Sequence, residues 1–463
     1  MKTFTIGEIL KATGGELICG SPADEVRGFA IDSRETGVGD MFFATKGARN
    51  DAHDFLANVI EKGCRALVIS DMNKLPAEKP DDLSVIVTED TLKALQELSR
   101  WYLNTLPLKK KIGVTGSVGK TSTRDMVYYV SAAKYKTGRN KKNYNSAFGL
   151  PLSILEFEPD TEVAVLEMGM DTFGEIELLA DIVRPDIGII THITDVNLLS
   201  MENLDNILKA KMEITTFFDE SSTLIVNGSC RMLTPEKVAG NYHLITADTK
   251  QGADYVISDI CDLGDKGIKY TLHRKDKQYE VNLPTAGAHN AMNSALAIAA
   301  GELLGIEPQQ AIDGLGQAEL TGKRLKVREN GGFKVIDDTY NACEDSVKSA
   351  INTLMATEGK RKVAVLGDII GLAHRAEEAH RGIGRYAADR GVDLLIAIGE
   401  EARYYAEEAA RIMGKDRAVY FPQKKDFIEA MTSLLKKGDV VMVKASRGME
   451  LEEVVEEILK DKD

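Results

Sequence analysis

Several features that would assign a function at once are missing from this sequence. It has no run of about 18 consecutive apolar residues, the length that a membrane-spanning helix needs. The opening segment, MKTFTIGEILKATGGE, lacks the apolar core of a secretory signal peptide. We therefore expect a cytoplasmic protein that does not insert into a membrane.

The sequence also lacks an excess of basic residues and any cysteine framework. Its 58 Lys and Arg residues are outnumbered by 72 Asp and Glu residues, and the net charge of −14 would repel a phosphate backbone, so nucleic acid is not an expected partner. The cysteines form no C-x-x-C pair, which argues against a disulfide framework or a zinc site and fits a reducing compartment. They are Cys19, Cys64, Cys230, Cys261 and Cys343.

What is present is an ordinary globular composition, with 43% apolar and 28% charged residues in a chain of 463. That length suits about three domains of roughly 150 residues each. An amphipathic stretch at 92–106 is followed by Pro107 and three lysines at 109–111, and the pattern changes again near residues 321–324. We predict domains 1–107, 108–320 and 321–463.

The second and third predicted domains alternate strand-like apolar runs with helical segments. IGVT, VAVLEMG and IGIITHI in the middle domain predict a parallel sheet. KVIDDTY, KVAVLGD, LLIAIGE and VVMVKAS in the last domain predict a Rossmann-like sheet. The expected fold class is α/β, with a parallel sheet in the central domain.

A phosphate-binding loop follows the strand IGVT and comprises Thr115, Gly116, Ser117, Val118, Gly119, Lys120 and Thr121. The backbone N–H groups of such a loop and the N-terminus of the next helix face a triphosphate. Lys120 would reach the outer phosphates, and the Thr121 hydroxyl would be placed for Mg²⁺. The loop has the shorter T-G-x-x-G-K-T form, because Val114 stands where the longer pattern has glycine.

This shorter loop is typical of Mur ligases and folylpolyglutamate synthetases, and other segments separate the two. The sequence resembles the Mur ligase family over essentially its whole length. The segments that carry the resemblance are DSR at 32–34, GVGDMFFATKG, NYNSAFGLPLSIL, LEMGM, GAHNAMNSALAIA, KRL, DDTYNA, LGD and KASRGMELE. DDTYN is similar to the branch that adds D-alanyl-D-alanine, whereas the branch that adds the third peptide residue has a D-Y-A-H-like segment there.

The resemblance implies a fold and an activity. The fold is a central ATPase domain flanked by an N-terminal domain for the UDP-linked substrate and a C-terminal Rossmann-like domain. The activity is ATP-dependent amide formation between the carboxylate of a UDP-linked muramoyl tripeptide and the amine of D-alanyl-D-alanine. An acyl phosphate is the intermediate, and ATP and Mg²⁺ are the expected cofactors.

The resemblance also implies roles for residues at the nucleotide and the metal. Arg324 matches the arginine that joins Lys120 at the phosphates, while Asn290 matches the adenine contact and Asp338 the ribose contact. The expected metal ligands are Thr121, Glu167, Asn197 and Lys211, the last as a carbamate. Without the resemblance, Glu167 would be a strand-end cap, and Lys209 and Lys211 would be two solvated helix lysines.

Substrate contacts follow in the same way. Ser33, Arg34 and the loop 51–55 resemble the elements that bind UDP, and Asn145 and Ser146 match the region that meets the muramoyl peptide. Tyr340 and Asn341 of DDTYN complete the expected substrate residues.

The sequence departs from the family pattern in three places. Asn197 stands where a histidine metal ligand is usual, with His192 in place of a strand asparagine. In the last domain, Cys343 and Glu344 replace Asn-Pro after Y-N-A, and Gly371 and Ala373 replace an acidic residue and a glycine. Since the family turns these last loops towards the incoming amine, we expect an altered amine site and intact ATP use.

Two alternatives stay open. The first is a Mur-type ligase that joins a different amine or uses a different acceptor, such as a pseudomurein precursor. The second is a P-loop nucleotide switch, although no N-K-x-D-like motif of a GTPase is present. We expect a monomer whose partners are a UDP-linked muramoyl peptide and a small amine or dipeptide.

Overall fold

The computed structural model describes residues 2–47, 50–141 and 143–460. The chain forms two compact units. Unit 1 comprises Met1–Thr115, Lys134–Gly188 and Glu213–Ser222, and unit 2 comprises Gly116–Ala133, Ile189–Met212 and Thr223–Asp463.

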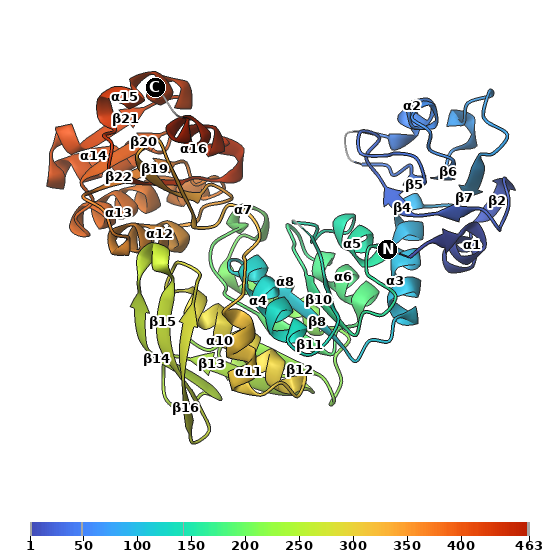
Figure 1. The fold of residues 1–463 in the computed structure, drawn as a ribbon, viewed down its shortest axis with the longest axis horizontal. Coiled ribbons are helices and arrows are strands. Elements are labelled where there is room, and N and C mark those ends of the chain that lie inside the picture. Colours follow the sequence, from blue (N-terminus) through green and yellow to red (C-terminus); the bar gives the residue numbers. More distant parts are fainter. Residues whose placement is uncertain (1, 48–49, 142, 461–463) are drawn as a thin grey trace. The chain divides into compact units, whose positions relative to one another are not determined.

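Unit 1 begins with a small α/β domain, coloured blue in Figure 1. Its five-stranded sheet has the order β2-β7-β6-β5-β4, and β1 pairs with β3 beside it. The strands are β1 (Phe4–Thr5), β2 (Glu16–Cys19), β3 (Glu25–Val26), β4 (Gly28–Ala30), β5 (Asp40–Phe43), β6 (Ala66–Ile69) and β7 (Ser84–Val87). The helices are α1 (Ile6–Thr13), α2 (Leu56–Glu61) and α3 (Thr91–Thr105). Asp90 caps α3 by accepting from the N–H groups of Leu92 and Lys93.

Unit 1 also holds three parallel strands in the order β8-β10-β9. These are β8 (Lys110–Thr115), β9 (Thr137–Arg139) and β10 (Val163–Glu167), with helices α5 (Gly149–Leu155) and α6 (Glu175–Val183). In the register of β8 and β10, Glu167 lies opposite Val114. Because the strands are parallel, Glu167 and the start of the phosphate loop lie at the same edge, where open α/β sheets bind ligands.

The first part of unit 2 holds the helix that follows the phosphate loop. The helices are α4 (Lys120–Ala132), α7 (Leu198–Met201), α8 (Leu204–Met212), α9 (Pro235–Val238), α10 (Asn290–Leu303) and α11 (Pro308–Leu315). The strands β12 (Thr223–Asn227), β13 (His243–Asp248) and β14 (Tyr255–Asp262) are parallel, and β15 (Ile268–Arg274) and β16 (Lys277–Leu283) extend them antiparallel. β11 (Ile187–Ile190) is divided between the two units.

The last part of unit 2 is a six-stranded sheet in the order β17-β18-β22-β19-β20-β21, in which only the β17–β18 pair is antiparallel. The strands are β17 (Lys326–Asn330), β18 (Phe333–Asp338), β19 (Arg361–Gly367), β20 (Leu394–Ile398), β21 (Ala418–Phe421) and β22 (Asp439–Lys444). The helices are α12 (Glu344–Ala356), α13 (Ala376–Asp389), α14 (Arg403–Met413), α15 (Lys424–Leu434) and α16 (Glu452–Leu459).

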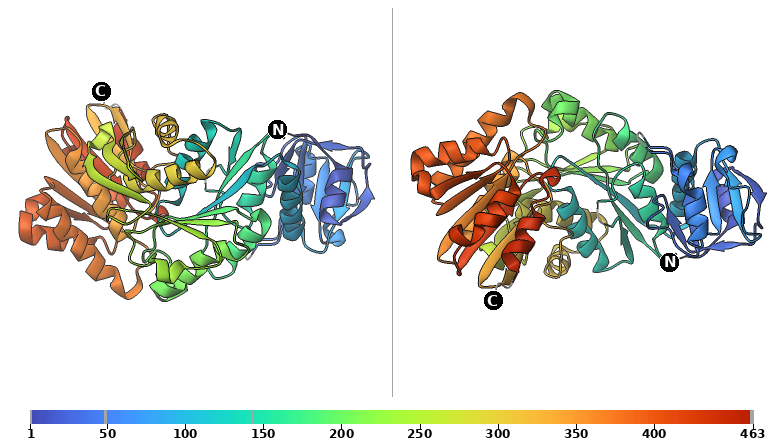
Figure 2. Two further views of the ribbon diagram at one scale, coloured as in Figure 1. Left: turned by 90° about the horizontal axis from the view of Figure 1, so that it is seen from below. Right: turned by 90° about the horizontal axis from the view of Figure 1, so that it is seen from above.

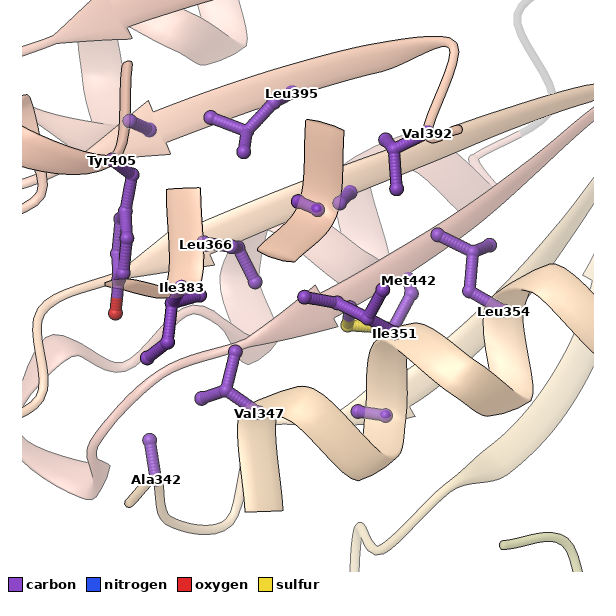
Figure 3. Close-up of a cluster of buried hydrophobic side chains, with 14 of the residues drawn as sticks. Ala342, Val347, Ile351, Leu354, Leu366, Ile383, Val392, Leu395, Tyr405 and Met442 are labelled. Atoms are coloured by element: carbon purple, nitrogen blue, oxygen red, sulfur yellow. The ribbon is translucent and has the colours of Figure 1, made fainter. Parts of the chain in front are cut away.

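Helices cover both faces of this sheet (Figures 1 and 2). One core joins α12, α13 and α14 to the sheet through side chains such as Ile351, Ile383 and Tyr405 (Figure 3). The opposite core joins α15 and α16 through Phe427 and Val455. The Rossmann-like α/β class expected for the last domain is therefore confirmed.

Candidate functional site

The phosphate loop connects β8 to α4 through two glycines with positive φ, 143° at Gly116 and 85° at Gly119. A Cβ on Gly116 would lie 2.1 Å from the Thr191 hydroxyl, and one on Gly119 would lie 2.9 Å from the Asn293 side-chain oxygen. Both positions thus require glycine for backbone conformation and for space. The Lys120 ammonium donates to the carbonyls of Gly116 (2.9 Å) and Ser117 (3.0 Å), so it lies folded over the loop.

The segment after β11, residues 191–194, forms hydrogen bonds to the phosphate loop. The Ser117 N–H donates to the His192 carbonyl (2.7 Å), and the Ser117 hydroxyl donates to the Thr194 carbonyl and accepts from the Thr194 N–H, both at 3.1 Å. The Thr191 hydroxyl donates to the Val118 carbonyl at 2.6 Å. Residues 191–194 therefore fix the backbone of the loop.

Asn290 begins α10 and is buried with Asn293 one turn later. Its amide donates to the Ala286 carbonyl (2.8 Å), and its oxygen accepts from the Asn293 amide (2.9 Å). Asn293 reaches the phosphate loop, because its side-chain oxygen lies beside Gly119. The N-terminus of α10 and the phosphate loop are thus neighbours.

Asn197 and Lys211 both lie on the segment that connects β11 to β12. Lys211 lies on α8 and is only 3% exposed, whereas the neighbouring Lys209 is exposed. The interpretation of Lys211 as a solvated helix lysine is therefore wrong. Asn197 directly precedes α7 in a left-handed conformation with φ 68°, which asparagine adopts more readily than most residues.

Arg324 follows a linker that leaves α11. Its guanidinium donates to the Thr321 carbonyl (3.2 Å) and lies over the Tyr340 ring, 4.0 Å from the centroid. The Tyr340 N–H donates to the Lys323 carbonyl at 3.3 Å. Tyr340 therefore holds Arg324 in place by stacking.

Asp338 ends β18 and is buried beside Lys444, its neighbour in the register with β22. Lys444 donates to the Asp338 carboxylate (2.6 Å) and to the Asn341 carbonyl (2.8 Å), so it joins two of the predicted residues. Burial raises the pKa of Asp338 above its usual value, although Lys444 works in the opposite direction.

In unit 1, Glu167 is 2% exposed and accepts a hydrogen bond from the Asn145 amide at 2.8 Å. The buried Asn140 holds the Glu167 backbone through its side chain, at 2.9 and 3.0 Å. The Ser146 hydroxyl accepts from the Gly149 N–H at 3.4 Å, at the start of α5. Two predicted residues, Glu167 and Asn145, are thus in contact.

The other predicted substrate residues of unit 1 lie on the small domain. Arg34 is 87% exposed and pairs with Asp32 at 2.6 Å, and this pair lowers the pKa of Asp32 to about 2. Ser33 accepts at its carbonyl from Lys62. In the loop 51–55, Asp51 accepts from the His53 ring at 2.6 Å, and the other ring nitrogen accepts from the Ser70 N–H at 2.9 Å.

Two of the departures in the last domain, Cys343 and Glu344, lie at the start of α12. Cys343 is 3% exposed and caps α12, and burial raises the pKa of its thiol. Glu344 pairs with Lys348 at 2.6 Å and with Arg375 at 3.4 Å. Arg375 also pairs with Asp195 of the segment that follows β11. The negative charge that Glu344 adds is therefore matched by cations of the same chain.

Within the described residues, no helix is long and apolar enough to cross a membrane. The same residues contain no group of three His, Cys, Asp or Glu side chains that could hold a metal ion.

Comparison with known proteins identifies the family to which this chain belongs. Sequence profiles of the Mur ligase family match residues 25–102 (catalytic domain), 114–301 (middle domain) and 323–447 (glutamate ligase domain). The UDP-N-acetylmuramoyl-tripeptide–D-alanyl-D-alanine ligase of Bacillus subtilis (strain 168) is 35% identical over 94% of this chain and 93% of its own length. The chain belongs to the Mur ligase family. The predicted family is therefore confirmed.

Two solved members of the family extend the likeness to the whole fold. A crystal structure of MurF from Acinetobacter baumannii matches with a TM-score of 0.87 and 27% identity, covering 99% of both chains. MurF ligase from Thermotoga maritima in complex with ADP matches with a TM-score of 0.79 and 27% identity, covering 94% of this chain and 98% of that one. The α/β fold class is confirmed, while the boundaries at 107 and 320 stay predictions.

Sequence reasoning missed several residues that the Mur ligase fold brings to the site. Asn293 contacts Asn290 and Lys444 contacts Asp338. Arg375 joins Glu344 to Asp195. Asn293 and Lys444 stand in segments that carry the family resemblance, whereas nothing in the sequence marks Asp195 or Arg375.

Proposed function

We propose that this protein joins a UDP-linked muramoyl tripeptide to D-alanyl-D-alanine with ATP, releasing ADP and phosphate as a step of peptidoglycan precursor synthesis in the cytoplasm. The observation that carries the proposal is the full-length likeness to ligases named for this reaction, in a chain that keeps the phosphate loop intact. The ADP in the Thermotoga maritima relative supports ATP as the nucleotide.

The proposed chemistry needs an activated carboxylate. The tripeptide carboxylate attacks the γ-phosphorus of ATP, ADP leaves, and the acyl phosphate is then attacked by the amine with release of phosphate. Lys120 and Arg324 neutralise charge on the phosphate oxygens, and the loop N–H groups hold them. Asn290 holds adenine and Asp338 holds ribose. Ser33 and Arg34 bind the UDP part, and Asn145, Ser146, Tyr340 and Asn341 bind the peptide.

Mg²⁺ fits the residues that the family pattern offers. Mg²⁺ takes few protein ligands and completes its shell with phosphate oxygens and water. The Thr121 hydroxyl, the Glu167 carboxylate, the Asn197 oxygen and a carbamate on Lys211 are all oxygen ligands. When bound, the ion would neutralise developing charge on the phosphates. The burial of Lys211 supports this choice over the exposed Lys209, because a ligand to a metal ion held among phosphate oxygens lies away from bulk water.

A second candidate is the same chemistry with a different small amine. The changes at Cys343, Glu344, Gly371 and Ala373 favour it, since they cluster in the two loops that the family turns towards the amine. The pairing of Glu344 with Lys348 and Arg375 weakens the argument from repulsion, because the added charge does not stand alone.

Steady-state kinetics separate the two candidates. ADP release is measured with a UDP-muramoyl tripeptide and D-alanyl-D-alanine, other dipeptides and single amino acids. We expect D-alanyl-D-alanine to give a kcat/KM well above every other amine if the first candidate holds. A higher kcat/KM for another amine would establish the second candidate, and nucleotide hydrolysis without any amide product would refute both.

A further inference from the structure

A buried ion pair on the phosphate-loop helix has no place in the chemistry described so far. Arg124 and Asp125 are both fully buried on α4. The Arg124 guanidinium donates to Asp125 Oδ1 from Nε (3.0 Å) and from Nη2 (2.6 Å). The second carboxylate oxygen, Oδ2, accepts from the Thr321 N–H at 2.6 Å. Asp125 therefore joins the phosphate-loop helix to the linker before Arg324.

The position of Asp125 on the helix connects it to the nucleotide side. Residues four apart lie on the same face of a helix, and they are about 6 Å apart along its axis. Asp125 thus lies one turn behind Thr121, on the same face. The linker is anchored to the helix that presents Lys120 and Thr121, one turn from the loop.

The linker between Thr321 and Leu325 is held at its other end as well. The Leu325 N–H donates to Asp338 Oδ1 at 3.3 Å, and Leu325 has a φ of 50°, a conformation that costs energy for a residue with a side chain. Between the two anchors, Arg324 bonds the carbonyl of Thr321, the residue whose N–H Asp125 accepts. A shift of Thr321 would therefore move the guanidinium.

We propose that Asp125 is a positioning residue for the ligase reaction: it fixes the linker to the phosphate-loop helix and so sets the reach of Arg324 to the phosphates. The proposal rests on the proposed role of Arg324. Displacing a catalytic group by about 1 Å can cost a hundredfold in rate, so an anchor that acts only through geometry can control turnover.

The test is a double-mutant cycle. Arg124→Met with Asp125→Leu replaces the ion pair by apolar side chains, which buried pairs often tolerate, and removes the acceptor for the Thr321 N–H. We expect kcat for ADP release to fall about tenfold while KM for ATP stays within about twofold. In an Arg324→Ala background, the same replacement should change kcat by less than about twofold, because its effect passes through Arg324.

Two further variants separate positioning from folding. Arg124→Gln with Asp125→Asn also removes both charges but keeps an acceptor oxygen, and it should retain kcat. Thr321→Pro removes the N–H group that donates to Asp125 and also replaces the threonine side chain and fixes φ at this position. It leaves the ion pair in place and should reproduce the loss of kcat even if the apolar pair fails to fold. Arg274→Met with Glu302→Leu, which breaks a pair between β15 and α10, is the matched control and should lower the Tm with kcat unchanged.

The outcomes are distinct. An equal loss of kcat from the apolar pair in the wild-type and Arg324→Ala backgrounds would overturn the positioning role and leave the ligase function standing. So would a folded apolar pair or Thr321→Pro variant with normal kcat. Near-normal kcat in Arg324→Ala alone would overturn both the role of Arg324 and this proposal.

Discussion

At the scale of single residues, Lys211 shows how much burial changes an interpretation. Two lysines stand two positions apart on α8, and only the family resemblance distinguishes them in the sequence. The fold exposes Lys209 and buries Lys211. The buried lysine, and not the exposed one, is therefore the candidate for a role at the site.

We predict that Lys211 carries a carbamate in the active enzyme. Lys211→Ala should lower kcat about a hundredfold or more, because an anionic metal ligand is lost, and acetate should restore part of the activity. ¹³C NMR in ¹³C-labelled bicarbonate should show a carbamate signal that Lys211→Ala lacks. Lys209→Ala is the control and should keep normal activity. Full activity with an unmodified Lys211 amine would contradict the prediction.

We predict that Lys120→Ala abolishes ligation and leaves the fold intact. The Lys120 ammonium donates to two loop carbonyls, at 2.9 and 3.0 Å, and it would exchange these for phosphate oxygens. ADP release should fall about a hundredfold or more, with an unchanged circular dichroism spectrum. Lys136→Ala, at a surface lysine that pairs with Asp160, should leave both unchanged. Near-normal turnover in Lys120→Ala would rule out the phosphate role.

At the scale of elements, the loop between β19 and α13 combines two unusual backbone conformations. Gly371 has a φ of 94° and Ala373 a φ of 51°. Alanine at the second position places a residue with a Cβ where the family has glycine, and a left-handed conformation costs such a residue roughly 1–2 kcal/mol.

Gly371→Ala and Ala373→Gly should therefore change the free energy of unfolding in opposite directions. Gly371→Ala should lower the free energy of unfolding by about 1 kcal/mol through strain alone, since nothing lies within 4 Å of the added Cβ. Ala373→Gly should raise it by up to about 1 kcal/mol, because relief of strain exceeds the entropy that glycine adds to the unfolded chain. Urea denaturation measures both. Gly382→Ala in α13 is the control and should stabilise the helix. Destabilisation by Ala373→Gly would show that the loop carries no strain.

His380 of α13 ties this loop to its helix and gives it a pH dependence. The Ile369 N–H donates to Nε2 at 3.2 Å, and Nδ1 lies 2.6 Å from the Ala376 carbonyl, an arrangement that suits the neutral ring. Burial lowers the pKa of His380, although Asp368 works in the opposite direction.

Because the folded pKa lies below the unfolded value of about 6.5, the unfolded state binds more protons between the two values. The contribution of His380 to the free energy of unfolding should therefore be fully present above about pH 6.5, and it should be lost as the pH falls towards the lowered pKa. Urea denaturation of the wild type and of His380→Gln over that range tests this. The free energy of unfolding of His380→Gln should change less with pH than that of the wild type. If both change equally with pH, the pH dependence comes from other groups.

At the scale of the whole molecule, we predict a monomer of 50.6 kDa. The net charge of −14 opposes association between copies. The large apolar side chains that are exposed among the described residues come from many elements, from Ile18 in β2 to Tyr420 in β21. Sedimentation equilibrium should give one species at moderate salt, and a dimer that persists on dilution would contradict the prediction.

The strands that are predictable from the sequence are those buried on both faces. The runs IGVT, VAVLE and LLIAI are continuous apolar segments, and the structure has β8, β10 and β20 there. The antiparallel extension by β15 and β16 was not predicted. Their alternating pattern, as in KQYEVNL, is more polar, so it gives a weaker signal than a continuous apolar run.

The sequence by itself determined the family, the fold class and the phosphate loop, because these depend on local patterns: glycines at a tight turn, a lysine before a helix, and apolar runs of strand length. Only the tertiary structure decided that Lys211 is buried, that Lys444 lies against Asp338, that Arg375 pairs with Glu344, and that Asp125 accepts from Thr321. Burial and long-range pairing depend on which segments meet in space, and residues about 200 positions apart in the chain carry no local mark of that meeting.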